Sequence, residues 1–178
     1  MRRLAEAAGV EAIGLYQHHR PDPKIPYAES IGALAELLDA GKIRMAGISN
    51  ADPDQIREAQ AILGGRLVSV QNQFSPAFRS SEPELRLCAE LGLAFLPWSP
   101  LGGIGSAADL GSSHAAFAEV AAQRGVSPQQ VTLAWMLALS PVVVPIPGSS
   151  RPETARDSAA AADLELTADE VSRLSAAR

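Results

Sequence analysis

The chain has 178 residues, of which 47% are hydrophobic, and it carries a formal net charge of −5. These values are typical of one soluble globular domain and give no reason to expect nucleic acid or an anionic membrane as a partner. No apolar run reaches the length of a membrane span, and the residues after Met1 are not expected to act as a signal peptide. The single cysteine, Cys88, excludes a disulfide within the chain and favours a reducing, cytoplasmic setting.

Strands and helices are expected to alternate along the chain. Short apolar blocks predict strands at residues 11–17, 43–48, 67–70, 93–96 and 142–146. Helical spacing and capping residues predict helices at 1–8, 31–38, 53–63, 81–91, 114–124, 127–139, 152–162 and from 168 onward. The Gly-rich segment 104–113 is expected to be a loop. Because each strand is a continuous apolar block, the sequence predicts parallel strands in an α/β fold, within one domain spanning 1–178.

Each predicted strand is followed by residues that could contact a ligand. In chain order they are His19; Ser49 and Asn50; Gln71 and Asn72; Trp98 and Ser99; Gly148 and Ser149. In parallel α/β folds, ligands bind at the carboxyl ends of the strands. The sequence therefore predicts a ligand site at this edge of the sheet.

Taken one at a time, these residues also fit plainer structural roles. His19 fits a solvated loop as well as the edge of an active site. Ser49 and Asn50, taken alone, fit a turn before the next helix better than a site. Gln71 fits a strand end that bonds the backbone, and Trp98 fits core packing as well as a flat ligand surface. Their shared position after strands favours the ligand site.

The last predicted strand is joined to a helix by a short loop with phosphate-binding chemistry. Gly148, Ser149 and Ser150 precede Arg151, and Pro152 starts the helix. Backbone N–H groups at a helix start, hydroxyls and a guanidinium together suit a phosphate. An ordinary capped loop with a solvated arginine is the alternative, and the coincidence of these groups favours phosphate. The sequence shows no cluster of metal-ligating residues.

Five ordered motifs carry a resemblance to a known family. They are LYQHHRPDP at 15–23, GISN at 47–50, VQN at 70–72, WSPLG at 98–102 and IPGSSRPE at 146–153. In order and spacing, these motifs resemble the aldo/keto reductases. The resemblance implies a (β/α)8 TIM barrel that binds NADP(H) and reduces small aldehydes or ketones to alcohols.

The resemblance also implies roles for single residues. His19 takes the place of the active-site histidine, which helps to orient the substrate carbonyl. Ser49, Asn50 and Gln71 take the places of residues that hold the nicotinamide carboxamide, and Trp98 that of the aromatic residue stacked on the nicotinamide ring. The remaining implied cofactor residues lie along the pyrophosphate, at Ser99, Pro100, Leu101 and Gly103, and around the adenosine 2′-phosphate, at Gly148, Ser149 and Arg151. A 2′-phosphate site favours NADPH over NADH.

The chain also differs from the family pattern. Thr154 stands where many relatives carry a basic residue, and Asp157 and Ser158 stand where an acidic residue and asparagine are usual, so the adenine contacts are not assigned. The family's catalytic group is Asp, Tyr, Lys and His, and the first three precede the histidine. Only 18 residues precede His19, and they include neither Asp nor Lys. The chain thus resembles strands four to eight of the barrel, an incomplete barrel.

These differences lead to two expectations for the isolated chain. It is expected to be inactive or nearly so, because general acid catalysis typically contributes about 10² to 10⁴ in rate. The alternative function is a non-catalytic NADP(H)-binding or assembly module that needs a partner to close the barrel. An unclosed sheet exposes two edges and an apolar inner face, which favours self-association or pairing through those edges.

Overall fold

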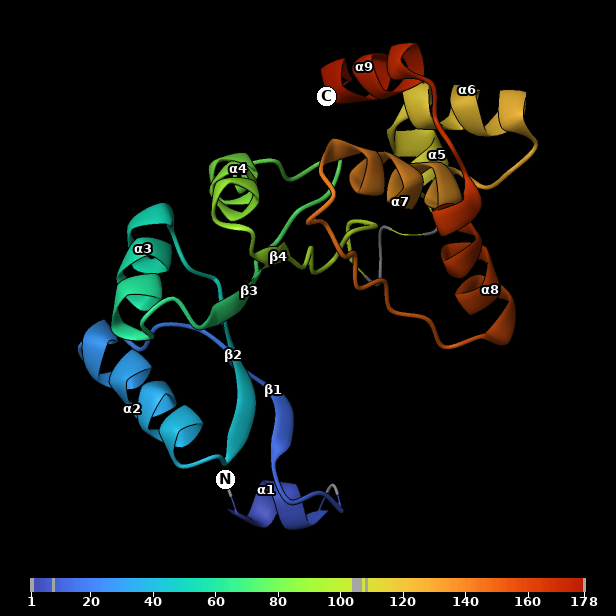
Figure 1. Cartoon of the computed structure of the whole chain (residues 1–178). Coiled ribbons are helices and arrows are strands. Elements are labelled where there is room, and N and C mark those ends of the chain that lie inside the picture. The colour runs from blue at the N-terminus through green and yellow to red at the C-terminus, as the bar shows by residue number, and fades with distance from the viewer. Residues whose placement is uncertain (1, 8, 104–106, 108, 178) are drawn as a thin grey trace. The chain divides into compact units, whose positions relative to one another are not determined.

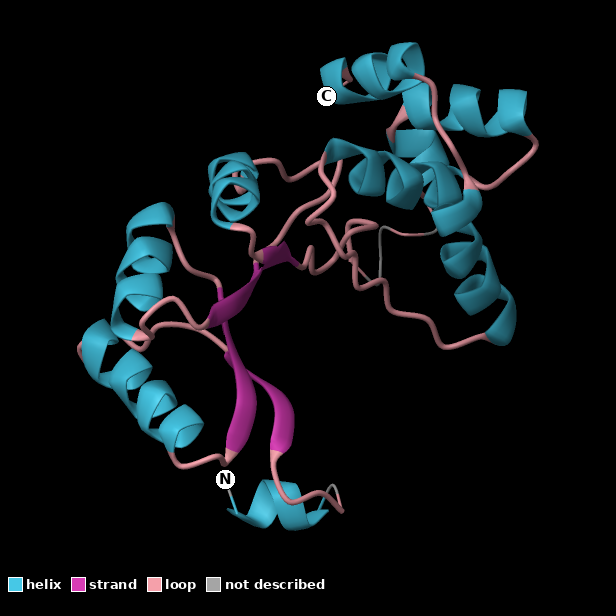
Figure 2. Ribbon diagram, viewed as in Figure 1, coloured by secondary structure: helices cyan, strands magenta, loops and turns pink. Residues whose placement is uncertain are grey.

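The computed structural model describes residues 2–7, 9–103, 107 and 109–177. These residues form two compact units, Met1–Asn72 with Arg86–Phe95, and Gln73–Leu85 with Leu96–Arg178. The strands of the sheet belong to the first unit, whereas the second unit is built from helices and irregular segments (Figure 2). Among the described residues, no helix is both long enough and apolar enough to cross a membrane.

The first unit is a parallel sheet with helices in the connections (Figure 1). Its strands are β1 (Ile13–His18), β2 (Ile43–Ser49), β3 (Leu67–Gln71) and β4 (Ala94–Phe95). They pair in the order β1-β2-β3-β4, and every pair is parallel, which confirms the predicted strand direction. The helices are α1 (Arg2–Ala7), α2 (Tyr27–Asp39), α3 (Pro53–Ile62) and α4 (Glu82–Leu91), of which Glu82 to Leu85 belong to the second unit.

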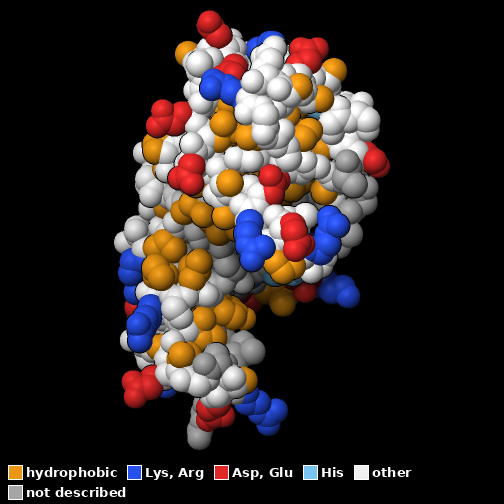
Figure 3. All heavy atoms as spheres, turned by 90° about the vertical axis from the view of Figure 1, so that its right-hand side faces the viewer, with side chains coloured by type: hydrophobic (Ala, Val, Ile, Leu, Met, Phe, Trp, Pro, Cys, Tyr) orange, Lys and Arg blue, Asp and Glu red, His pale blue; other side chains and the backbone are white. Residues whose placement is uncertain are grey.

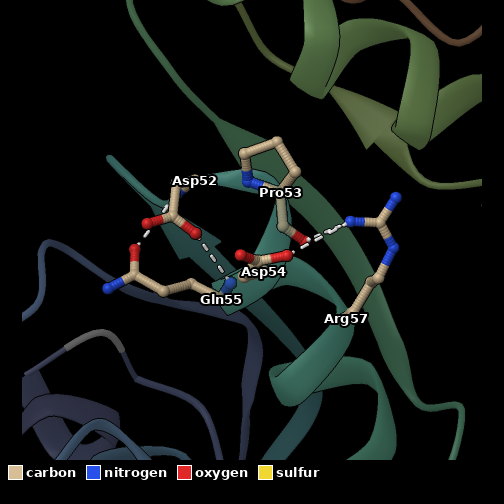
Figure 4. Close-up of polar contacts among 5 residues, drawn as sticks. All are labelled: Asp52, Pro53, Asp54, Gln55 and Arg57. Carbon is tan, nitrogen blue, oxygen red and sulfur yellow. Dashed lines mark hydrogen bonds and ion pairs between the residues drawn. The ribbon is translucent and has the colours of Figure 1, made fainter.

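The start of α3 follows directly from the sequence. The Asp52 carboxylate accepts a hydrogen bond from the Gln55 N–H at 2.8 Å, and the Asp52 N–H donates to Gln55 Oε1 at 3.1 Å (Figure 4). Pro53 occupies the first turn, where no N–H donor is required. Arg57 adds contacts to the Pro53 carbonyl and the Asp54 carboxylate at 3.4 and 3.5 Å. The predicted helix at 53–63 is confirmed, and its cap fixes where the chain turns after β2.

Helices α2 and α3 supply the core of the first unit. They contact each other and strands β2 and β3 (Figure 1). The buried apolar residues from these elements are Ile31, Leu34, Ile43, Ala46, Ile48, Ile56, Ala59, Leu67 and Val70. In contrast, the cross-strand neighbours Leu15 and Met45 are 36% and 43% exposed. Because neighbouring side chains on a strand alternate between faces, the sheet buries one face and leaves apolar groups accessible on the other.

The second unit is built around α7 (Pro128–Leu139). All residues from Val131 to Met136 are buried, so α7 is covered on every side. The Trp135 ring stacks on Phe74 at 5.9 Å between centroids and meets Phe117 edge-on at 5.6 Å. The surrounding elements are α5 (Leu110–Ser113), α6 (Ala115–Arg124), α8 (Pro152–Ala160), the 3-10 helix η1 (Ala161–Asp163) and α9 (Ala168–Ala176).

Two capping-box sequences in this unit, Ser127 to Gln130 and Thr167 to Glu170, are realised differently. Thr167 and Glu170 form a complete box at the start of α9. Ser127 caps α7 by accepting from the Gln130 N–H at 3.0 Å, but the Gln130 side chain donates to the Ala160 carbonyl at 3.1 Å. A contact between α7 and the end of α8 therefore replaces the second half of the box.

Two predicted segments differ in the structure. Residues 142–146 were expected to be a strand, but they form no regular ladder; the Val143 N–H donates to the Ser140 carbonyl at 3.1 Å, and the Ile146 N–H donates to the Pro97 carbonyl at 3.3 Å. Pro145 and Pro147 remove donors that a ladder needs. The expected loop 104–113 ends in the short helix α5, whose Leu110 is buried; residues 104–106 and 108 lie outside the described residues.

Candidate functional site

Four predicted site residues meet at the carboxyl edge of the sheet in the first unit. His19 follows β1, and Gln71 ends β3. Ser49 ends β2, and Asn50 follows it. The Ser49 hydroxyl donates to the Gln71 carbonyl at 2.5 Å, and the Asn50 side-chain amide donates to the His19 carbonyl at 2.9 Å. The same amide approaches Ser49 Oγ at 3.2 Å. The ends of three adjacent strands are thus joined by side-chain hydrogen bonds.

Asn50 has an unusual backbone conformation at this edge. Its φ of 55° lies in the left-handed region, which is uncommon for residues other than glycine. The Asn50 N–H donates to the Gln71 carbonyl at 3.0 Å, and the next residue, Ala51, is paired with the side chain of Asn72. The sequence placed Asn72 among the residues that follow the strands but assigned it no contact of its own. Its place beside Gln71 after a predicted strand was the one available signal.

The two neighbouring histidines have different surroundings. His18 is half-buried, and its ring meets the Tyr27 ring edge-on with centroids 5.9 Å apart. Burial, with a smaller contribution from His19, lowers the pKa of His18 from its ordinary value of 6.5, so it is neutral at pH 7. Burial, followed by the charges of Glu58 and Asp52, raises the pKa of Tyr27. His19, one residue further on, is exposed at the strand end.

The Trp98 segment lies in the second unit. Trp98 is half-buried, bridges to Gln73, and its carbonyl accepts from the Phe74 N–H at 3.4 Å. The next residue, Ser99, has a left-handed φ of 50°, and its carbonyl accepts from the Gly102 N–H at 3.0 Å. The chain therefore reverses tightly directly after the aromatic residue.

The rest of this loop divides between packing and open backbone. Pro100 is buried, and Leu101 packs against the cluster of Leu133, Ala134 and Ala161. Gly103 has a φ of 101°, a conformation that L side chains rarely adopt. Because the Leu101 side chain is used in packing, this loop can offer a ligand mainly backbone groups.

The Gly148–Thr154 segment forms an exposed, internally bonded loop at the start of α8. The Ser149 hydroxyl donates to the Arg151 carbonyl at 2.8 Å and is hydrogen-bonded to the Thr154 hydroxyl. Thr154 also donates to the Arg151 carbonyl at 3.0 Å. Gly148, Ser149 and Arg151 are exposed, and nothing lies within 4 Å of the position that a Cβ of residue 148 would occupy. An anion could therefore approach this backbone closely.

A mostly apolar pocket adjoins this loop within the second unit. Its volume is about 350 Å³, and its lining residues are Leu133, Leu137, Pro145, Pro147, Ser149, Ala155, Ser158, Ala159, Ala161 and Ala162. The Asp157 carboxylate, which precedes the lining residue Ser158 in sequence, accepts a hydrogen bond from the Ser127 hydroxyl at 2.5 Å. This carboxylate therefore ties α8 to the start of α7. The pocket offers a ligand mainly an apolar surface with serine hydroxyls.

Charged groups of both signs are mixed on the side where α6 and α8 lie in Figure 1. Figure 3 views this side and shows Lys and Arg interspersed with Asp and Glu, with hydrophobic groups between them. Within the described part of the chain, no group of three or more His, Cys, Asp or Glu is arranged to hold a metal ion.

The predicted residues form two groups, one in each unit. His19, Ser49, Asn50 and Gln71 share hydrogen bonds at one sheet edge in the first unit. The second unit contains the other eight, which are Trp98, Ser99, Pro100, Leu101, Gly103, Gly148, Ser149 and Arg151. Each group is local to its unit, and in each unit the residues follow a strand or extended segment.

Comparisons with known proteins agree with these motifs. The model of the Aldo/keto reductase family matches residues 1–178. An uncharacterised oxidoreductase of Schizosaccharomyces pombe is 37% identical over 174 residues, which cover 98% of this chain and 54% of that protein. The pyridoxine 4-dehydrogenase of Escherichia coli is 37% identical over 145 residues, covering 82% of this chain and 48% of the relative.

Solved structures show the same fold. A thermostable aldo-keto reductase crystallised with the inhibitor epalrestat superposes with a TM-score of 0.85 at 28% identity, covering 97% of this chain and 62% of that one. An aldo/keto reductase from Klebsiella pneumoniae in complex with NADP and acetate gives 0.83 at 27% identity, covering 97% and 61%. The expected α/β class of the TIM-barrel reductases is confirmed. The chain spans about half the length of the curated relatives it matches, and it belongs to the aldo/keto reductase family.

Proposed function

We propose that this chain provides the histidine strand and the NADP(H)-binding segments of an aldo/keto reductase. The reaction is the reduction of a small aldehyde or ketone to an alcohol, for which NADPH, when bound, supplies the hydride. The supporting observation is the hydrogen-bonded edge where the Asn50 amide joins the His19 carbonyl and the Ser49 hydroxyl joins the Gln71 carbonyl. Both units are proposed to be parts of one reductase domain.

The residues of the chain suit distinct parts of the cofactor. In the first unit, Ser49, Asn50 and Gln71 hold the nicotinamide carboxamide, and the exposed His19 helps to orient the substrate carbonyl. In the second unit, Trp98 presents its ring to the nicotinamide. The Ser99–Gly103 loop follows the pyrophosphate with backbone groups.

The loop before α8 suits the adenosine 2′-phosphate. Arg151 provides an exposed guanidinium, and Gly148 leaves open space for a close approach. Ser149 shapes the loop through its bonds to Arg151 and Thr154. This combination supports NADPH over NADH as the preferred cofactor.

We also propose that the 178-residue chain by itself turns over slowly or not at all. The 18 residues before His19 contain no Asp or Lys, and their one tyrosine, Tyr16, lies within β1. Without a positioned acid, proton delivery to the carbonyl oxygen loses about 10² to 10⁴ in rate. Cofactor binding is therefore the property to measure first.

Titration calorimetry of the folded chain with NADPH and NADH tests the proposed function. We expect saturable binding of NADPH that is tighter than binding of NADH. Arg151→Ala should weaken NADPH binding and leave NADH binding unchanged. Arg156→Ala, which removes another exposed arginine from α8, is the matched control and should change neither. Absence of NADPH binding to the unmodified chain would refute the proposal.

A second candidate is a non-catalytic NADP(H)-binding or assembly module that pairs with a partner. The observation that favours it is the edge strand β1, where Leu15 and its neighbour Met45 are exposed. An unpaired parallel edge beside apolar side chains is suited to self-association. Size-exclusion chromatography with light scattering distinguishes the two, because a monomer at all concentrations would remove this candidate.

A further inference from the structure

Asn72 forms a two-point clamp on the backbone of Ala51. The Ala51 N–H donates to Asn72 Oδ1 at 3.2 Å, and Asn72 Nδ2 donates to the Ala51 carbonyl at 2.8 Å. Asn72 is 5% exposed and Ala51 2% exposed. The Asn72 side chain satisfies both the N–H and the C=O of Ala51, as a neighbouring strand would. The clamp therefore extends the connection between β2 and β3 beyond the strand ends.

The clamped residue lies between two backbone features that define the site edge. Before it comes Asn50, with a left-handed φ of 55°, and after it comes Asp52, the N-cap of α3. A left-handed conformation is unfavourable for a residue with a side chain and persists where its surroundings hold it. Two contacts hold the left-handed conformation of Asn50. One is the bond from the Asn50 N–H to the Gln71 carbonyl, and the other is the Asn72 clamp on the next residue, Ala51.

The conformation of Asn50 determines where its side chain points. From this backbone the amide reaches the His19 carbonyl at 2.9 Å and Ser49 Oγ at 3.2 Å. An extended backbone at residue 50 would turn the side chain away from β1. The sequence of contacts therefore runs from Asn72 through Ala51 and Asn50 to the backbone of His19.

We propose that Asn72 is a positioning residue that fixes Asn50, and through it His19, for binding of the nicotinamide end of the cofactor. Asn72 acts through the backbone and does not itself touch the reacting atoms. The proposal rests on the proposed function for its binding readout, because NADPH is the probe. Its structural part, the dependence of Asn50 and His19 on Asn72, stands independently.

The same turn provides a matched control. The Gln55 amide oxygen accepts from the Asp52 N–H at 3.1 Å, one residue beyond Ala51 (Figure 4). Gln55→Ala removes a side-chain amide contact from this turn without removing either bond to Ala51. A purely structural role for Asn72 would give Asn72→Ala and Gln55→Ala the same pattern, a lower melting temperature with unchanged affinity in the folded state.

The experiment measures NADPH affinity by calorimetry well below each melting temperature, together with NMR spectra of the Asn50 and Ala51 amides and the His19 ring. For Asn72→Ala we expect about tenfold weaker binding, the loss expected for one hydrogen bond, and shifted resonances at all three residues. Gln55→Ala should bind normally and leave the His19 ring unshifted. If Asn72→Ala does not fold, Asn72→Asp keeps an acceptor for the Ala51 N–H and replaces the donor to the Ala51 carbonyl with a carboxylate oxygen.

The outcomes separate the two proposals. Unchanged affinity together with unchanged Asn50 and His19 resonances in the Asn72 variant overturns the positioning role. If the unmodified chain does not bind NADPH, the proposed function fails, and the NMR comparison still decides whether Asn72 controls Asn50 and His19. Equal weakening of binding in Asn72→Ala and Gln55→Ala would also count against a specific role.

Discussion

The side chain of Gln17 lies directly over Gly47 of the neighbouring strand. The position that a Cβ of residue 47 would occupy is 2.0 Å from Gln17 Oε1 and 2.4 Å from the Ser69 hydroxyl oxygen. Gln17, Gly47 and Ser69 are partners in register across β1, β2 and β3. This polar row lies two residues before His19, Ser49 and Gln71, so the glycine makes room for a polar layer below the candidate site.

Gly47→Ala is therefore expected to destabilise the first unit. Real Cβ atoms do not approach other atoms this closely, so Gln17 or the strand must shift, at a cost typical of overpacking, about 1–3 kcal/mol. Urea denaturation followed by circular dichroism measures the loss. Gly14→Ala in β1 is the control, because nothing lies within 4 Å of its Cβ position, and it should be neutral or slightly stabilising. Equal effects of the two substitutions would contradict the packing argument.

The two left-handed site residues should respond differently to glycine. Ser99→Gly relieves the backbone at φ 50°, and we expect a gain of about 1 kcal/mol or less. Asn50→Gly relieves the same kind of strain but loses the bonds to His19 and Ser49, so a net loss of about 1 kcal/mol is expected. Thermal unfolding of both variants checks the contrast, and stabilisation by Asn50→Gly would show that its side-chain bonds contribute little.

His18 should make the chain less stable in mild acid. Its pKa is lowered in the folded state, mainly by burial, so the unfolded chain binds the proton more readily. The contribution of neutral His18 is fully present above pH 6.5 and is lost as the pH falls through and below that value. His18→Phe keeps a ring against Tyr27 and removes the titration. The urea midpoints at pH 8 and pH 5.5 should differ less in this variant than in the unmodified chain. An equal difference in both proteins would exclude His18 as a source of the loss of stability in acid.

Arg79 should be required for the packing of α9. Its guanidinium donates to the Leu174 and Ser175 carbonyls at 3.3 and 2.5 Å and lies over the Trp135 ring at 4.6 Å. A lysine cannot supply this planar set of donors, so Arg79→Lys is expected to cost about 1–3 kcal/mol.

Hydrogen exchange and urea denaturation measure the effect, with faster exchange expected in α9 before global unfolding. Arg173→Lys is the control on α9 itself, because Arg173 makes a surface ion pair with Glu119 at 3.8 Å. Such pairs contribute about 0–1 kcal/mol. A stability loss for Arg79→Lys no larger than that for Arg173→Lys would contradict a special role for Arg79.

At residues 142–146 the local sequence did not determine the structure. Its apolar residues fit a strand, but Pro145 and Pro147 occupy alternate positions and remove donors from one side of the segment. Whether such a segment completes a ladder depends on the neighbour it meets. Here the Ile146 N–H donates to the Pro97 carbonyl at 3.3 Å, and the Val143 N–H donates to the nearby Ser140 carbonyl at 3.1 Å.

The sequence by itself determined the parallel α/β class, the boundaries set by caps such as Asp52 and Thr167, and the polar residues that follow the strands. These features are local, since apolar blocks, capping side chains and prolines act within a few residues. The tertiary structure alone decided that Asn72 clamps Ala51, that Gln17 covers Gly47, and that Asp157 bonds Ser127. Such contacts join residues about 20 to 30 positions apart, and no local pattern encodes them, because they exist only when adjacent strands or helices are in register.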